Sequence, residues 1–167
     1  MRIQDSVTGR LILLCGIAGS GKTTAAKQLE ERGAVRMCPD EWLVSLGFDI
    51  YDKDARASVE ALQWQLTQTL LGRGLTVVDE SGVWLREERN RRRLWARGDG
   101  HRVELHFLDA PVAVLTERVV ERNRSLPDGA PRIEPGLVAF WNDRIERPDA
   151  EELALFDPST SLDQDAG

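Results

Sequence analysis

A glycine-rich segment directly follows the apolar run at residues 11–15. It reads Gly16-Ile17-Ala18-Gly19-Ser20-Gly21-Lys22-Thr23. A buried strand entering such a segment and a helix leaving it are typical of a Walker A phosphate-binding loop. The glycines let the main chain curl until successive N–H groups point at phosphate oxygens, and the helix adds its positive N-terminal end. Because strand, spacing and helix agree, a chance match in a glycine-rich turn is disfavoured.

The two residues that end the loop have distinct expected roles. Lys22 is placed to reach the β- and γ-phosphates of a nucleotide, and the Thr23 hydroxyl is placed to ligate Mg²⁺. We therefore predict ATP and Mg²⁺ as cofactors. The predicted cofactor-binding residues of the loop are Gly16, Ala18, Gly19, Ser20, Gly21, Lys22, Thr23 and Thr24.

The length and composition favour one globular domain. At 167 residues, such a domain buries roughly 70% of the surface that its unfolded chain exposes. No apolar stretch approaches the roughly 20 residues that span a bilayer, and residues 1–6 are too polar and short for a secretory signal. We therefore expect a cytoplasmic protein. Cys15 and Cys38 each end a predicted buried strand, and we interpret both as core residues rather than a disulfide.

The formal charge of −6 is concentrated towards the C-terminal end. Six of the 28 acidic residues lie in 149–167, which has no Lys or Arg, so residues 1–148 hold 22 acids against 22 bases. A net charge of zero over residues 1–148 argues against sequence-independent binding to long nucleic acid, which normally needs a broad basic surface. We expect a phosphate-loop domain over 1–148 and a loosely held acidic tail over 149–167.

Strand and helix signals alternate along the chain. Strands are predicted at 10–15, 34–38, 75–79 and 102–108. Helices are predicted at 21–32, 40–46, 54–71, 85–97, 111–123 and 136–146, with a Pro/Gly-containing loop at 125–135. The alternation predicts a three-layer α/β fold, in which helices cover both faces of a parallel sheet and the ligand lies beyond the carboxyl ends of the strands.

Acidic residues follow the strands at this expected ligand edge: Asp40, Asp79, Glu80 and Asp109. A carboxylate at Asp40 is placed to take a proton from an acceptor hydroxyl or to orient it. The alternative is an N-cap, because Asp before a helix satisfies free N–H groups. For Asp79 we favour a carboxylate that faces Mg²⁺ through water over one that caps a loop. Thr23 and Asp79 are thus the predicted metal residues.

Arg118 and Arg122 lie one helical turn apart, and their helix runs into the loop at 125–135. Arginines at the hinge of a mobile lid, over residues 124–135, would close over the transferring phosphoryl group and offset its charge. The alternative is a solvated helix end, where arginines favour the helix dipole and pair with neighbouring glutamates. The predicted catalytic residues are Lys22, Asp40 and Arg122, and Arg118 and Arg122 join the cofactor-binding set.

An acceptor pocket is expected at the same edge. Trp42 and Trp84 each closely follow a strand-end acid and are candidates for its apolar walls, with core packing as the alternative. Arg86 and Arg89 begin a basic helix, which either contacts an anionic substrate or is an exposed, self-paired helix. The predicted substrate-binding residues are Asp40, Trp42, Asp79, Trp84 and Arg89.

Together these pieces resemble the small P-loop kinases of the polynucleotide-kinase-like and gluconate-kinase-like group, which includes short bacterial AAA-type ATP-binding proteins. The likeness covers residues 10–157: the Walker A loop, Asp40-Glu41, Val77-Val78-Asp79, Leu108-Asp109-Ala110-Pro111, 117–123 and 146–151. It implies a nucleoside-kinase-like sheet with strand order 2-3-1-4, and residues 153–156 are the candidate for a fifth strand. It also implies that Asp40 is the catalytic, acceptor-side Asp and that Arg122, with Arg118 or Arg124, belongs to a lid over ATP.

One departure from the family pattern bears on the substrate. A polynucleotide kinase of this group usually carries a basic residue soon after the Asp, whereas Trp42-Leu43-Val44 stands here. We therefore expect an ATP- and Mg²⁺-dependent kinase that transfers the γ-phosphate to a hydroxyl of a small molecule, such as an antibiotic, a sugar or a nucleoside-like compound. A 5′-hydroxyl polynucleotide kinase and a non-catalytic ATP-binding switch protein are the alternatives. No membrane partner is expected.

Overall fold

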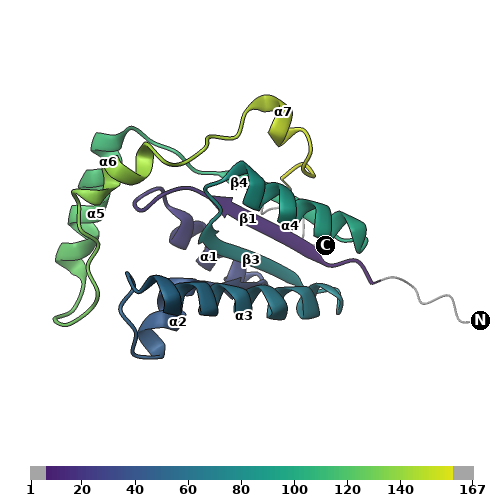
Figure 1. Cartoon of the computed structure of the whole chain (residues 1–167), viewed down its shortest axis with the longest axis horizontal. Coiled ribbons are helices and arrows are strands. Elements are labelled where there is room, and N and C mark those ends of the chain that lie inside the picture. The colour runs from purple at the N-terminus through teal and green to yellow at the C-terminus, as the bar shows by residue number, and fades with distance from the viewer. Residues whose placement is uncertain (1–6, 160–167) are drawn as a thin grey trace, which may run out of the picture.

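The computed structural model describes residues 7–159, and strands alternate with helices through most of them (Figure 1). The strands are β1 (Arg10–Cys15), β2 (Val35–Met37), β3 (Thr76–Gly82) and β4 (Arg102–Phe107). The helices are α1 (Lys22–Glu31), α2 (Pro39–Ser45), α3 (Lys53–Leu71), α4 (Arg86–Gly98), α5 (Val112–Ser125), α6 (Leu137–Asn142) and α7 (Ala150–Leu153). α6 is shorter than predicted, and α7 falls where a loose tail was expected.

The sheet is parallel, with the strand order β2-β3-β1-β4, which confirms the predicted order. β1 lies inside the sheet and is covered on both faces. Leu11, Leu13 and Cys15 belong to the larger core cluster, which also holds residues of α3, α4 and α5. Ile12 and Leu14 belong to a smaller cluster with residues of α1. This two-sided burial explains why the strand is a continuous apolar run rather than an alternating one.

Residues 153–156 do not form a fifth strand, because they lie at the end of α7 and in the turn after it. Asp157 instead covers the outer edge of β4. Its N–H donates to the Val103 carbonyl at 2.8 Å, and its carboxylate accepts from the Val103 N–H at 2.7 Å. At Val103 the outer edge of β4 is therefore paired with a single residue instead of a further strand.

The expectation of a loosely held tail is wrong for residues 149–157. The Asp149 carboxylate accepts a hydrogen bond from the Glu152 N–H at 2.7 Å and caps α7. Glu152 is only 3% exposed and pairs with Arg89 of α4, and Phe156 packs in the larger core cluster. Glu152 and Phe156 have partners that are distant in sequence, which composition cannot reveal. Residues 160–167 of the predicted tail lie outside the described residues.

Among the helices of residues 7–159, none combines the length and the apolar character that crossing a membrane requires.

Candidate active site

The Walker A residues form a curled loop between β1 and α1. The Gly16 N–H donates to the Gly82 carbonyl at 3.3 Å, and the Ser20 N–H donates to the Ile17 carbonyl at 3.2 Å. Gly19 and Gly21 have φ angles of 82° and 97°, in the region that favours glycine. A Cβ on Gly19 would also lie 2.5 Å from the Leu115 carbonyl of α5. Only glycine therefore allows α5 to approach the loop this closely.

Lys22 folds back over this loop. Its Nζ donates to the carbonyls of Gly16 at 2.7 Å and Ile17 at 3.0 Å. Burial lowers the pKa of Lys22 to about 8, although the nearby charges of Glu80 and Asp40 act to raise it. The ammonium therefore lies over the carbonyls of the loop, where the charges of two carboxylates from different strand ends act on it.

The carboxylate beside Thr23 belongs to Glu80. The Thr23 Oγ1 donates to Glu80 Oε1 at 2.5 Å, and Glu80 Oε2 lies 3.0 Å from the Arg36 Nε of β2. Both Glu80 and the Arg36 side chain are almost wholly buried. The loop-side carboxylate is thus held between a hydroxyl and a guanidinium.

Asp79 lies away from Thr23, contrary to the prediction that it faces the metal. Its carboxylate pairs with Arg92 of α4 and accepts from the Ser81 N–H at 2.9 Å. It lines a small polar pocket together with residues of α3, among them Gln63 and Thr67. The physical reason is that β3 continues to Gly82, and successive residues of a strand point to opposite faces.

Asp40 lies in the first turn of α2 and is not its N-cap. The N-cap is Cys38, and no side chain caps this end of the helix. Pro39 fixes the first turn, where its missing N–H costs nothing. The Asp40 carboxylate pairs with Arg56 of α3, which also donates to the Ile50 carbonyl at 3.0 Å. The capping alternative therefore fails, and the carboxylate is held by an arginine that is 16 residues further along the chain.

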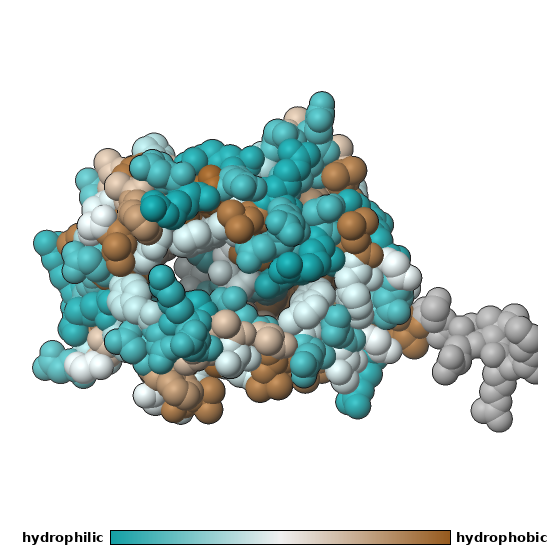
Figure 2. Space-filling model, viewed as in Figure 1, coloured by the Kyte–Doolittle hydropathy of each residue, from teal (hydrophilic) through white to brown (hydrophobic). Residues whose placement is uncertain are grey.

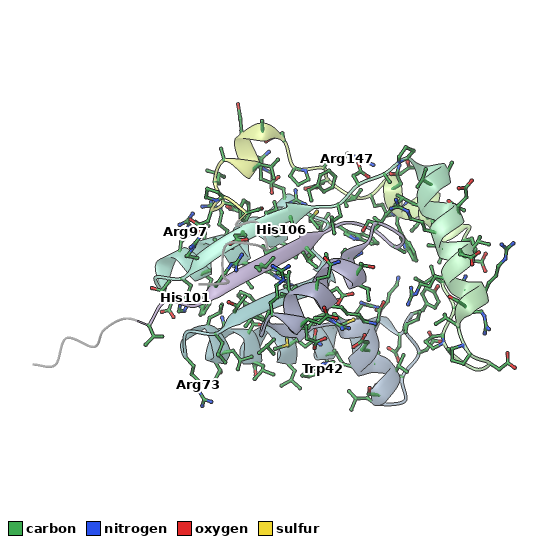
Figure 3. The ribbon with its side chains drawn as sticks, turned by 180° about the vertical axis from the view of Figure 1, so that it is seen from behind. Trp42, Arg73, Arg97, His101, His106 and Arg147 are labelled. Carbon is green, nitrogen blue, oxygen red and sulfur yellow. The ribbon has the colours of Figure 1, made fainter. Side chains whose placement is uncertain are left out.

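The other predicted acceptor-pocket residues are Trp42, Trp84 and Arg89. Trp42 is half-buried against the larger core cluster, and Figure 3 shows it on α2. The Trp84 Nε1 donates to the Gly16 carbonyl of the loop at 3.1 Å. Arg89 is 0% exposed, and its Nε donates to Glu152 Oε1 at 2.6 Å. The prediction that Arg89 binds substrate is therefore wrong, because its donors are committed inside the protein.

Of the two α5 arginines predicted to bind ATP, one contacts the loop, and their role at a lid hinge stays a prediction. The Arg118 Nη1 donates to the Gly19 carbonyl at 3.2 Å, and Arg122 is exposed one turn further on. In the segment that follows, the Asn123 side chain bonds both the N–H of Ile133, at 3.1 Å, and its carbonyl, at 2.6 Å. The segment between α5 and α6 is therefore folded back onto the end of α5.

This segment also contacts the connection between α2 and α3, because the Glu134 N–H donates to the Tyr51 hydroxyl at 3.1 Å. Figure 2 shows a hollow between the α5–α6 side and the α2–α3 side, beyond the end of β1. Among the remaining predicted loop residues, Ser20 is buried, Ala18 is half-buried and Thr24 is exposed on the first turn of α1. His101, to which no role is assigned, lies at the end of the sheet away from α5 (Figure 3).

The sequence places Glu80 at the ligand edge without a specific role, and it does not single out the two other charged residues of the site, Arg36 and Arg56. Strand alternation offered a signal for Glu80, because Val78 and Glu80 share a face that Asp79 does not. The apolar Val78 packs on the α1 side of the sheet, and Thr23 lies in the first turn of α1. Nothing in local spacing points to Arg56, which reaches Asp40 only because α2 and α3 pack together.

Residues 11–133 match the AAA domain family, and the chain belongs to it. It is 33% identical over 121 residues to a nucleotide-binding protein of Neisseria gonorrhoeae. That match covers 71% of this chain and 37% of the relative. The chain thus spans little more than a third of the length of the curated relatives it matches, which include a nucleotide-binding protein of Neisseria meningitidis.

Two solved structures show the same fold. A chain of the Pnkp1/Rnl/Hen1 RNA repair complex superposes with a TM-score of 0.66 at 15% identity, over 92% of this chain and 45% of that one. A gluconokinase from Sinorhizobium meliloti 1021 has a TM-score of 0.54 at 21% identity, over 87% of this chain and 79% of that one. The expected P-loop kinase-like fold is therefore confirmed.

The pKa of Lys22 is expected to set the pH dependence of nucleotide affinity. Only the protonated ammonium forms charge-assisted hydrogen bonds to phosphate oxygens, and burial lowers the pKa of Lys22 in the free protein to about 8. MgATP affinity should therefore fall as pH rises above this value, by up to about tenfold per pH unit. Lys22→Arg keeps its charge and should lack this inflection. Calorimetric titration with MgATP on both sides of the pKa measures it, and a flat wild-type profile would contradict it.

Proposed function

We propose that this protein is an ATP-dependent phosphotransferase that moves the γ-phosphate to a hydroxyl group of a small molecule. The observation that carries the proposal is geometric: Lys22 follows β1 and Asp40 follows β2, so both lie at the carboxyl edge of one parallel sheet. One group is placed to hold the donor phosphates and the other to receive a proton from the acceptor. The P-loop kinase-like fold and membership of the AAA domain family support the nucleotide half of this proposal.

In the proposed reaction each residue acts from the position described above. The loop N–H groups bind the phosphates, and Lys22 turns from the carbonyls of Gly16 and Ile17 to a phosphate oxygen. Asp40 exchanges its contact with Arg56 for the acceptor hydroxyl, which it orients and deprotonates as the oxygen attacks. Arg118 and Arg122 offset the charge of the transferring group from the α5 side.

The oxygen donors at the loop fit Mg²⁺. The Thr23 hydroxyl and the Glu80 carboxylate are already in hydrogen-bond contact, and hard oxygen ligands are those that Mg²⁺ prefers. We propose that Thr23 holds the ion directly and that Glu80 holds it through water, in place of the predicted Asp79. When bound, Mg²⁺ would neutralise phosphate charge and fix the orientation of the β- and γ-phosphates.

The charges around Asp40 favour an acceptor without strong negative charge. Arg56 is the cation beside it, and its Nη1 also lies 3.4 Å from Glu60 Oε1. Because two carboxylates flank one guanidinium, the positive charge is already matched. A hydroxyl compound that is neutral or zwitterionic therefore suits this position better than a phosphorylated one.

A second candidate function is phosphorylation of a 5′-hydroxyl nucleic-acid end. The observation in its favour is Arg56 itself, which supplies in space the basic residue that the sequence lacks after Asp40. Radiolabelled ATP offered with sugars, nucleosides, aminoglycoside antibiotics and a 5′-hydroxyl oligonucleotide separates the two candidates. An oligonucleotide product whose formation falls steeply with salt would favour the second. A phosphorylated small molecule identified by mass spectrometry supports the first and excludes a non-catalytic switch.

Asp40→Asn is expected to slow transfer to the best acceptor of that panel by about 10²–10⁴-fold, because the amide cannot take a proton. MgATP affinity should be unchanged, because the loop is intact. The matched control is Glu41→Gln, which removes the neighbouring carboxylate of α2 that pairs with Arg36. Initial rates at saturating MgATP measure both variants. Full activity of the Asp40→Asn protein would refute a base at this position.

Glu80→Gln is expected to raise the Mg²⁺ concentration needed for ATP binding by roughly 10–100-fold, because a water-held metal loses its charged acceptor. Asp79→Asn is the comparison, since its carboxylate pairs with Arg92 on the other face of β3. It should lower folding stability and leave the Mg²⁺ requirement of the folded protein unchanged. Magnesium titrations of ATP binding distinguish the two, and the opposite ranking would restore Asp79 as the metal residue.

A further inference from the structure

The turn that follows β3 holds the first residue of the phosphate-binding loop from two sides. The Gly82 carbonyl accepts from the Gly16 N–H at 3.3 Å, and the Trp84 Nε1 donates to the Gly16 carbonyl at 3.1 Å. A Cβ on Gly82 would lie 2.8 Å from the Trp84 Nε1, so the turn leaves no spare space between them. The path of the loop therefore depends on the position of this turn.

The turn contains an unfavourable backbone conformation. Val83 has a φ of 37°, and it is the one non-glycine residue with positive φ in the described part of the chain. A β-branched residue adopts this conformation only when its surroundings enforce it. Arg89 supplies that enforcement, because its Nη1 donates to the Val83 carbonyl at 3.0 Å and to the Trp84 carbonyl at 2.8 Å.

Arg89 is in turn held by the C-terminal segment. Its Nε and Nη2 donate to the two carboxylate oxygens of Glu152 at 2.6 and 2.9 Å. Arg89 is 0% exposed and Glu152 3% exposed, and a buried guanidinium without its carboxylate is strongly unfavourable. Glu152 lies in α7, outside the residues 11–133 that match the AAA domain family.

We propose that Glu152 and Arg89 are positioning residues that set the geometry of the phosphate-binding loop through Trp84. The need for Trp84 is greatest when nucleotide binds. Lys22 then leaves the Gly16 carbonyl for a phosphate oxygen, and the indole N–H stays as the donor to that carbonyl. The inference rests on the nucleotide-binding half of the proposed function and is independent of the acceptor.

Trp84→Phe tests the hydrogen bond from Trp84 to the Gly16 carbonyl. Phenylalanine keeps an aromatic ring against Trp141 and loses only the N–H donor. It should weaken MgATP and MgADP binding by roughly tenfold, the effect of leaving a partly buried carbonyl unpaired. Binding of AMP, which lacks the β- and γ-phosphates, should change much less. Trp64→Phe is the matched control, because its indole lies in the same core cluster but faces Gln68 of α3.

Glu152→Gln tests the contribution of the Arg89–Glu152 ion pair, and Arg97→Gln is its control. Arg97 is another arginine of α4 that pairs with the C-terminal segment, through Asp157, but Figure 3 shows it far from the loop. Calorimetry with MgATP below the unfolding temperature distinguishes a displaced loop from a partly unfolded protein. Displacement of the loop raises Kd, whereas partial unfolding lowers only the number of binding sites. We expect Glu152→Gln to raise Kd at least as much as Trp84→Phe, and Arg97→Gln to leave it unchanged.

Three results would overturn the inference. If the Trp84→Phe protein binds MgATP with the wild-type Kd, the turn does not set the geometry of the loop. This result holds even if the Glu152→Gln protein fails to fold. A Glu152→Gln protein with fewer sites but an unchanged Kd shows that α7 only stabilises the fold. Failure of the wild-type protein to bind MgATP removes the nucleotide site itself and with it the proposed function, whereas failure to find an acceptor leaves the inference standing.

Discussion

The two-sided burial of β1 is the constraint on which the rest of the structure depends. Leu11 to Cys15 are all 0% exposed, so the strand has one register and one depth in the sheet. Its carboxyl end therefore delivers Gly16 to a defined point, between the turn after β3 and the start of α1. The close approach of Gly19 to α5 then limits how far the loop can move. A phosphate-binding loop needs this rigidity, because its N–H groups must already point inward when the nucleotide arrives.

Three groups of the site bond to partners within it, whereas the buried Ser20 hydroxyl has no hydrogen-bond partner among residues 7–159. Lys22 bonds to loop carbonyls, Thr23 to Glu80, and Asp40 to Arg56. Each contact engages a group that the proposed reaction would use. Nucleotide and acceptor would therefore exchange existing hydrogen bonds for new ones, and such exchanges have a small net free energy. The larger gain would come from charge, because triphosphate oxygens replace neutral carbonyls around a largely desolvated ammonium.

Most of the fold and part of the site were predictable, for physical reasons that particular residues illustrate. The apolar run before Gly16 and the helix after Lys22 are local signals, and local signals identified the loop. The register of β3 is not local, and placing its end at Asp79 rather than Gly82 put the wrong carboxylate beside Thr23. The sequence around Arg89 predicts an exposed basic helix. In the fold Arg89 is buried, because it pairs with Glu152, which is 63 residues away. Composition likewise marked residues 149–157 as loose, because acids without neighbouring bases resemble a solvated tail.

The sequence alone determined that a glycine-rich phosphate-binding loop follows a buried strand, that strands and helices alternate, and that an acid begins the helix after the second strand. These features follow from hydrophobic periodicity and from the backbone freedom of glycine, both of which act over a few residues. Only the tertiary structure decided which acids face the loop, which arginines are buried, and that α7 supports the turn next to Gly16. Those outcomes depend on pairs such as Asp40–Arg56 and Arg89–Glu152. A buried charge is stable only beside a partner, and the packing of helices selects that partner.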